Sequence, residues 1–211
     1  MSDEALRQAA RGAAASDEAA LAALLRQRQR LGELEPAALR RVAALGYAPA
    51  AHALDLPTPT GDLAERADAY LGASPLSDCV RLALCAARAA APACDPADAA
   101  AVGRLLYALG DLLLDLDDGD AQDGVDDQLR RLDPATPLVM GQPAYPPDAP
   151  AARWALQAAF EAGRSTQHPQ LFRVHAQCAV VFAARAVGEP TVEAALLRDV
   201  VSRHLNGRAR F

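Results

Sequence analysis

The sequence contains no lysine, so all 21 of its basic side chains are arginines. Without lysine the phosphate-binding pattern Gly-x-x-x-x-Gly-Lys-Ser/Thr cannot occur, and the dinucleotide-binding pattern Gly-x-Gly-x-x-Gly is missing too. ATP-driven activity is therefore not expected. The catalytic patterns Gly-x-Ser-x-Gly and His-Glu-x-x-His are also absent, which lowers the expectation of an enzyme.

Cysteines and long apolar runs are scarce as well. The four cysteines form no Cys-x-x-Cys pair, and such thiols are typical of a reducing compartment. No apolar run reaches the ~20 residues that a membrane-spanning helix needs, and the N-terminus shows no charged-then-apolar leader. The sequence therefore predicts a cytoplasmic protein that does not associate with membranes.

Alanine and leucine dominate what is present. Hydrophobic residues make up 52% of the chain and aromatic residues only 4%, while β-branched residues are too sparse to supply several strands. Alanine is the strongest helix former, and apolar residues recur at three- and four-residue spacing. We therefore expect an all-α fold without a sheet, either a multi-helix bundle or an irregular helical-repeat array, of about ten helices.

Two proline-containing stretches divide this helical sequence. Residues 1–55 are expected to form an N-terminal helical-hairpin module. Residues 62–211 are expected to form a helical bundle, interrupted by an acidic loop at 115–127 and a proline-rich connector at 133–147.

The stretch Leu39-Arg-Arg-Val-Ala-Ala-Leu-Gly-Tyr-Ala-Pro-Ala-Ala-His-Ala-Leu54 resembles the helix-turn-helix units of HEAT-like and Sel1-like repeats. It is also similar to uncharacterised alanine-, leucine- and arginine-rich helical proteins of GC-rich bacteria, some of them of the adaptor or immunity kind. The resemblance implies a binding scaffold and carries over no catalytic residue. No fixed-period repeat continues through the remaining sequence, as a true solenoid would require.

Charge is distributed unevenly along the chain. Residues 93–133 hold eleven acidic side chains against three arginines, a net charge of −8, whereas the whole chain carries −6 and residues 134–211 carry +3. An acidic chain disfavours nucleic acid as a partner, while such polarity favours charge-steered association or self-association.

The acidic side chains gather where an apolar helix is expected to end. That helix opens at Asp95 and Pro96, and its apolar stripe extends from Val102 to Leu116. Carboxylates at a helix C-terminus oppose the helix dipole. Water and salt, arginines of the chain, a bound cation or a basic partner would each relieve that conflict.

The first hypothesis is a non-enzymatic protein-binding scaffold of the adaptor or immunity type that presents the acidic loop to a basic protein partner. Apolar anchors beside the loop would add affinity, and Tyr145, Met140 and Leu138 are the candidates for that role. A homo-oligomer formed through the polarised surface is a variant of this hypothesis. The predicted partner-binding residues are Asp115, Asp117, Asp118, Asp120, Asp123, Asp126 and Tyr145.

The alternative hypothesis is a metal-dependent all-α enzyme, resembling a phosphohydrolase, in which Asp111, Asp115 and Asp118 hold a divalent cation; no other cofactor is expected. Asp111 and Asp115 have the one-turn spacing that such helices use. An EF-hand loop is not formed, because Gly119 and Asp120 are transposed relative to its pattern and no glutamate closes it.

Two further groups of side chains have a structural interpretation. His175 and Cys178 share one helical face, but a zinc site there would lack two ligands, so we expect both to pack in the core. The N-terminal arginines are nearly balanced by acids of the same module, so a solvated face is expected. They are Arg26, Arg28, Arg30, Arg40 and Arg41.

Overall fold

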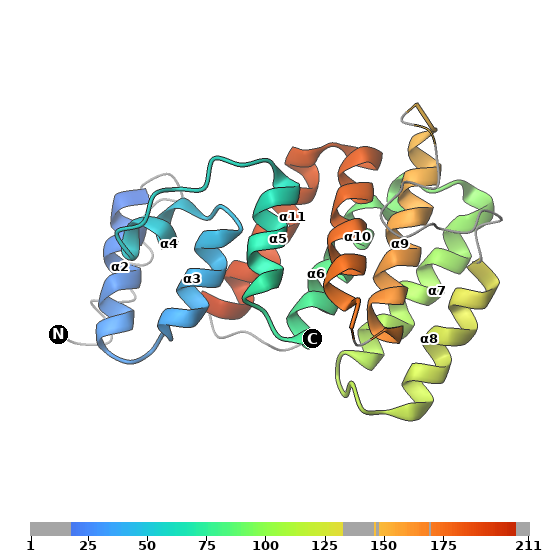
Figure 1. The fold of residues 1–211 in the computed structure, drawn as a ribbon, viewed down its shortest axis with the longest axis horizontal. Coiled ribbons are helices and arrows are strands. Elements are labelled where there is room, and N and C mark those ends of the chain that lie inside the picture. The colour runs from blue at the N-terminus through green and yellow to red at the C-terminus, as the bar shows by residue number, and fades with distance from the viewer. Residues whose placement is uncertain (1–17, 133–145, 147, 169, 206–211) are drawn as a thin grey trace. The chain divides into compact units, whose positions relative to one another are not determined.

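A computed structural model describes residues 18–132, 146, 148–168 and 170–205 of the chain. Within these ranges the chain forms ten α-helices and one short 3-10 helix, with no strand (Figure 1). The predicted all-α fold of about ten helices is therefore confirmed. No helix of the described ranges is long and apolar enough to cross a membrane. Of the proline-rich connector 133–147, only Pro146 lies within the described part of the chain.

The chain divides into two compact units, residues 1–70 with 197–211 and residues 71–196. The segments 1–55 and 62–211 divide the chain differently, because residues 62–70 and the end of the last helix group with the first unit. In the first unit, α4 packs against both α2 and α3, and residues 39–54 lie on α3 and α4. The helices that begin in this unit are α2 (Glu18–Arg30), α3 (Pro36–Ala44), α4 (Ala48–Ala53) and α5 (Leu63–Gly72).

The turn between α3 and α4 depends on Gly46. Its φ of +107° lies in the region that side chains disfavour, and a Cβ at this position would meet the guanidinium of Arg66. Arg66 donates to the carbonyl of Leu45 at 3.4 Å, and Leu45 itself is fully buried. The Arg66 side chain is flexible and could move aside, so it is the positive φ that favours glycine at this turn.

The second unit contains the helices from α6 to the first part of α11. Helices α6, α9 and α10 pack against one another, while α7 and α8 pack on each other and on α9. The bounds are α6 (Leu76–Ala90), the 3-10 helix η1 (Ala91–Ala93), α7 (Pro96–Leu112), α8 (Gly119–Leu132), α9 (Ala151–Gln167), α10 (Phe172–Val187) and α11 (Glu189–Leu205).

Trp154, the only tryptophan of the sequence, anchors α9 to α10. Its ring is 2% exposed and stacks on Phe182, with 5.5 Å between the ring centroids. The guanidinium carbon of Arg185 lies 4.7 Å from the same ring, and the indole N–H donates to the carbonyl of Ala149 at 3.1 Å. The fluorescence of this residue therefore reports on the packing of the second unit.

Helix α7 begins at Pro96 as predicted, but it is shorter than its leucine stripe suggested. The Asp95 side chain makes no capping hydrogen bond, and the helix ends at Leu112 rather than continuing to Leu116. Leu114 is 67% exposed. Leu113 is still buried, whereas Leu114, Asp115, Asp117 and Asp118 are exposed, so the chain leaves the packed face of α7 soon after Leu112.

Candidate functional site

The acidic segment predicted as a loop at 115–127 is mostly helical. Only residues 113–118 connect α7 to α8, which begins at Gly119. The Asp118 carboxylate accepts hydrogen bonds from the backbone N–H groups of Asp120, at 3.0 Å, and Ala121, at 3.2 Å. It thereby caps the N-terminus of α8, and Asp115 similarly accepts from the N–H of Asp117 at 3.1 Å.

This corrects the electrostatic argument made from the sequence. Asp118 and Asp120 lie at the N-terminus of α8, where the helix dipole favours negative charge, and not at the C-terminus of α7. Asp111 and Asp115 remain near the end of α7. Part of the cluster is therefore stabilised by local structure alone.

Six of the eight aspartate carboxylates between residues 111 and 127 are nevertheless exposed. Within the described ranges none of them forms an ion pair with an arginine; the Asp127 carboxylate pairs with Arg131 at 2.6 Å, on the same helix. Asp126 accepts from the side-chain amides of Gln122 and Gln167, so its carboxylate is engaged within the unit. We define the acidic surface by the six exposed residues, Asp111, Asp115, Asp117, Asp118, Asp120 and Asp123.

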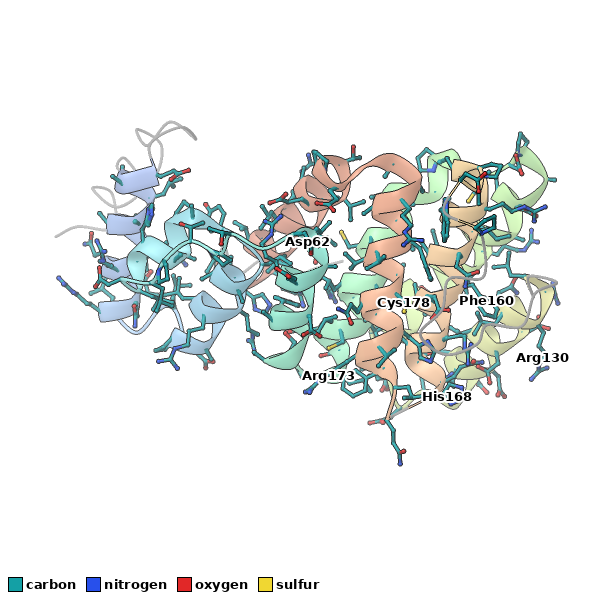
Figure 2. The ribbon with its side chains drawn as sticks, turned by 45° about the horizontal axis from the view of Figure 1, so that its top comes forward. Asp62, Arg130, Phe160, His168, Arg173 and Cys178 are labelled. Carbon is teal, nitrogen blue, oxygen red and sulfur yellow. The ribbon has the colours of Figure 1, made fainter. Side chains whose placement is uncertain are left out.

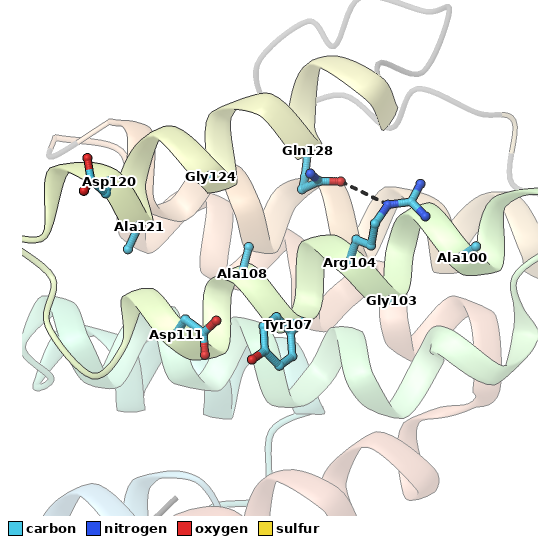
Figure 3. Close-up of a pocket in the computed structure, with 10 residues that line it drawn as sticks. All are labelled: Ala100, Gly103, Arg104, Tyr107, Ala108, Asp111, Asp120, Ala121, Gly124 and Gln128. Atoms are coloured by element: carbon cyan, nitrogen blue, oxygen red, sulfur yellow. Dashed lines mark hydrogen bonds between the residues drawn. The ribbon is translucent and has the colours of Figure 1, made fainter.

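A groove of about 590 Å³ adjoins the acidic surface between α7 and α8. Figure 3 shows Asp111 and Asp120 toward one end of this groove and Arg104 and Gln128 toward the other, where the Arg104 Nε donates to the Gln128 amide oxygen at 3.4 Å. Most of the remaining lining residues are alanine or glycine. We call this the α7–α8 groove; its lining residues are Ala100, Gly103, Arg104, Tyr107, Ala108, Asp111, Asp120, Ala121, Gly124 and Gln128.

Tyr107 is the one aromatic residue among those lining the groove, and its side chain is 70% exposed. Leu114, in the connection that follows α7, is another exposed apolar side chain beside the acidic surface. Sequence analysis did not identify either residue as a binding candidate. Tyr107 shares a helical stripe with Asp111 on the side of α7 opposite its leucines, and that spacing was the available signal.

The three aspartates considered for a metal site, Asp111, Asp115 and Asp118, are not gathered on one helix. Because α7 ends at Leu112, Asp111 and Asp115 are not one turn apart on a common helix. Among the residues that the structure describes, no group of three or more His, Cys, Asp or Glu side chains is placed to hold a metal ion. Asp118 is the third residue of that proposed set, and its carboxylate caps α8.

His175 is buried in the core, as expected, but it has an acidic partner that the sequence did not reveal. Its Nδ1 lies 2.6 Å from Glu161 Oε2, and the Gln157 side-chain amide donates to Glu161 Oε1 at 3.2 Å. All three side chains are at most 5% exposed. Gln157 and Glu161 are four residues apart within an otherwise apolar helix, which is the signal that marks them as an internal polar pair.

Cys178, which was also expected to pack in the core, is only partly buried. Figure 2 shows Cys178 on α10, with Arg173 near the start of that helix and His168 just after α9. Burial raises the pKa of the Cys178 thiol to about 11, and the nearby Glu161 charge adds to the effect. A thiol that stays protonated is a poor nucleophile and metal ligand.

Two of the N-terminal arginines, Arg26 and Arg28, are engaged within the first unit. Arg26 pairs with Asp55 at 2.6 Å and donates to the carbonyls of His52 and Ala53. Arg28 pairs with Glu33 at 3.2 Å and also donates to a backbone carbonyl. The Arg26–Asp55 ion pair forms part of the lining of a hollow of about 320 Å³. These two side chains therefore already satisfy each other's charge.

Three predicted anchors, Tyr145, Met140 and Leu138, lie outside the described residues. Comparisons of the chain with protein-family models, with curated proteins and with solved structures found no match. The α7–α8 groove and the acidic surface are therefore the candidate functional site of the described residues.

Proposed function

We propose that this chain is a non-enzymatic, cytoplasmic protein-binding scaffold of the adaptor or immunity type. In this proposal the acidic surface and the α7–α8 groove together bind a basic protein partner. The observation that carries it is the juxtaposition of six exposed carboxylates, none paired with an arginine of the described chain, with a groove that contains an exposed tyrosine.

The carboxylates would act mainly on the rate and selectivity of association. A pair of opposite charges 4 Å apart is worth about 1 kcal/mol in bulk water, and charges beyond about 8 Å are screened at physiological ionic strength. Several exposed carboxylates therefore steer a basic surface toward the groove without fixing it strongly. The proposal requires binding that weakens as salt rises.

Lasting contact would come from the groove itself. Tyr107 presents an exposed ring that can stack on an arginine of the partner, and Asp111 lies one turn further along the same helix to receive its charge. The exposed Leu114 adds apolar area beside the acidic surface. Free thiols at all four cysteines agree with a reducing compartment.

The test is a selection of binders from a phage library of random 16-residue peptides on the immobilised chain. We expect net-positive peptides to be enriched at low salt. A fluorescein-labelled copy of the strongest binder should then lose at least tenfold in affinity between 50 and 500 mM NaCl, measured by fluorescence anisotropy.

The variant pair isolates the acidic surface. Replacing Asp115, Asp117, Asp120 and Asp123 by asparagine removes four charges, leaves the Asp118 cap in place and should weaken binding at least tenfold. Enriched peptides that are not basic, or that bind both variants equally, would overturn the proposal. The matched control removes four exposed carboxylates elsewhere through Glu35→Gln, Asp68→Asn, Asp95→Asn and Glu189→Gln, and should bind like the unmodified chain.

A further inference from the structure

Gly103 and Gly124 lie in the interiors of α7 and α8, and both line the α7–α8 groove. Glycine in a helix interior destabilises the helix relative to alanine, so its presence usually reflects a need for close approach. Among the residues that the structure describes, nothing approaches either position, because a Cβ built on Gly103 or on Gly124 meets no atom within 4 Å. The described part of the chain therefore shows no internal packing use for these two glycines.

Gly163, another glycine in a helix interior of the same unit, can be compared with Gly103 and Gly124. It lies in the interior of α9, and a Cβ there would come within 2.6 Å of the Leu129 side chain, so the packing of α8 on α9 accounts for it. Gly103 and Gly124 have the same helical context without such a neighbour. The space above Gly103 and Gly124 is therefore filled by no residue of the described chain.

The shape of the groove indicates which kind of backbone fits it. Its α7 lining recurs at the three- and four-residue spacing of a single helical stripe, from Ala100 to Asp111, and Ala121, Gly124 and Gln128 form the stripe on α8. Because five of the ten lining residues are alanine or glycine, the two rows form a seam with space into which the side chains of a third helix can pack. An extended peptide would gain less, because the helix backbones on either side already use their hydrogen-bonding groups internally.

The seam is also polarised from end to end. Asp111 and Asp120 lie toward one end, whereas Arg104 lies toward the other and donates only to the neutral Gln128 amide within the described ranges (Figure 3). Eleven residues separate its outermost α7 positions, which corresponds to about 16 Å, or three helical turns. An occupant of that length would meet negative charge at one end and positive charge at the other.

We infer that the α7–α8 groove receives one amphipathic helix of the partner protein, about three turns long, with arginine or lysine at its Asp111–Asp120 end and a carboxylate at its Arg104 end. Gly103 and Gly124 allow this helix to approach closely. The inference rests on the proposed function for the basic character of the partner. A second copy of this chain fits less well, because the six carboxylates of the acidic surface far outnumber Arg104.

The test fills the groove without disturbing the fold. Gly103→Leu and Gly124→Leu each place a side chain in open space, so both variants should keep the circular dichroism and Trp154 fluorescence of the unmodified chain. The probe is the strongest basic peptide from the phage selection, measured by fluorescence anisotropy. Each groove variant should weaken its binding at least tenfold, whereas Gly72→Leu, at the open end of α5, should leave it unchanged.

Two further measurements examine the helix and its polarity. A central proline in the peptide should abolish binding, and the bound peptide should gain helical circular dichroism. Arg104→Glu should weaken binding about tenfold, and replacing the carboxylate at that end of the peptide by arginine should restore it.

The outcomes separate this inference from the proposed function. If the acidic-surface variant loses the peptide but both leucine variants bind normally, the helix inference is wrong and the basic-partner proposal stands. If the selection yields no basic peptide, or neither set of variants matters, both fall. If light scattering shows that the unmodified chain dimerises and that Gly124→Leu is monomeric, the occupant is a second copy and the inferred partner helix is wrong.

Discussion

Glu161 is expected to be among the most sensitive positions of the second unit. Its carboxylate is almost completely buried and accepts from two side chains, His175 at 2.6 Å and Gln157 at 3.2 Å. Glu161→Ala leaves both donors buried without an acceptor. Leaving a buried hydrogen-bond donor without an acceptor costs about 1–3 kcal/mol, so the loss of two such acceptors is a large fraction of the ~5–15 kcal/mol by which native proteins are stable.

The conservative variant separates hydrogen bonding from packing. Glu161→Gln retains an acceptor for His175, and rotation of the Gln157 amide restores the second hydrogen bond. Because both hydrogen bonds are kept, this substitution should cost only about 1–2 kcal/mol. The exposed Asp123→Ala on α8 serves as the control and should change stability by no more than about 0.5 kcal/mol.

Urea unfolding followed by Trp154 fluorescence measures these differences in the second unit itself, since α9 carries both Trp154 and Glu161. The midpoint should shift with little change in slope, because the area exposed on unfolding is nearly the same. A loss below about 1 kcal/mol for Glu161→Ala, or equal losses for the alanine and glutamine variants, would refute the buried network.

We expect three further results. Asp118→Ala should lower the free energy of unfolding by about 1 kcal/mol, whereas Asp118→Asn should nearly preserve it, because asparagine also caps helices; equal losses in urea unfolding would contradict the capping role. Gly103→Ala and Gly124→Ala should each raise stability by about 0.5–1 kcal/mol, seen as a higher melting temperature, since the added methyl groups meet nothing. Burial raises the pKa values of Cys79, Cys94 and Cys178 from the ordinary 9.0 to about 11, so the unfolded chain releases these protons first. Stability should therefore fall as pH rises from 9 through 11, and iodoacetamide should label these thiols more slowly at pH 8 in the native chain than in urea; equal labelling rates would show that the thiols are not protected.

The helical architecture was accessible from the sequence because it follows from local rules. Alanine supplies propensity throughout, and Pro96 marks the start of α7. The boundary between α7 and α8 was placed less well, because Asp118 was interpreted as one more member of an acidic loop. Its position two and three residues before free helical N–H groups makes it a cap instead.

The candidate site was accessible only in part. The acidic residues are evident as a charge pattern, but a groove depends on how two helices face each other, which no local pattern contains. Gly103 and Gly124 are 21 positions apart in sequence, and only the packing of α7 on α8 brings them to the same hollow. The pairing of Glu161 with His175 likewise depends on the contact between α9 and α10.

The short connection 113–118 has an evolutionary consequence. It sets how far α8 is displaced along α7, and thus which residues of the two helices line the groove together. Adding or removing a residue there would slide one row of small side chains past the other while leaving every aspartate in the chain. Substitutions among the aspartates would change the charge of the acidic surface and leave the shape of the groove intact. The shape of the partner that fits and the charge of the partner that is attracted can therefore evolve through separate mutations.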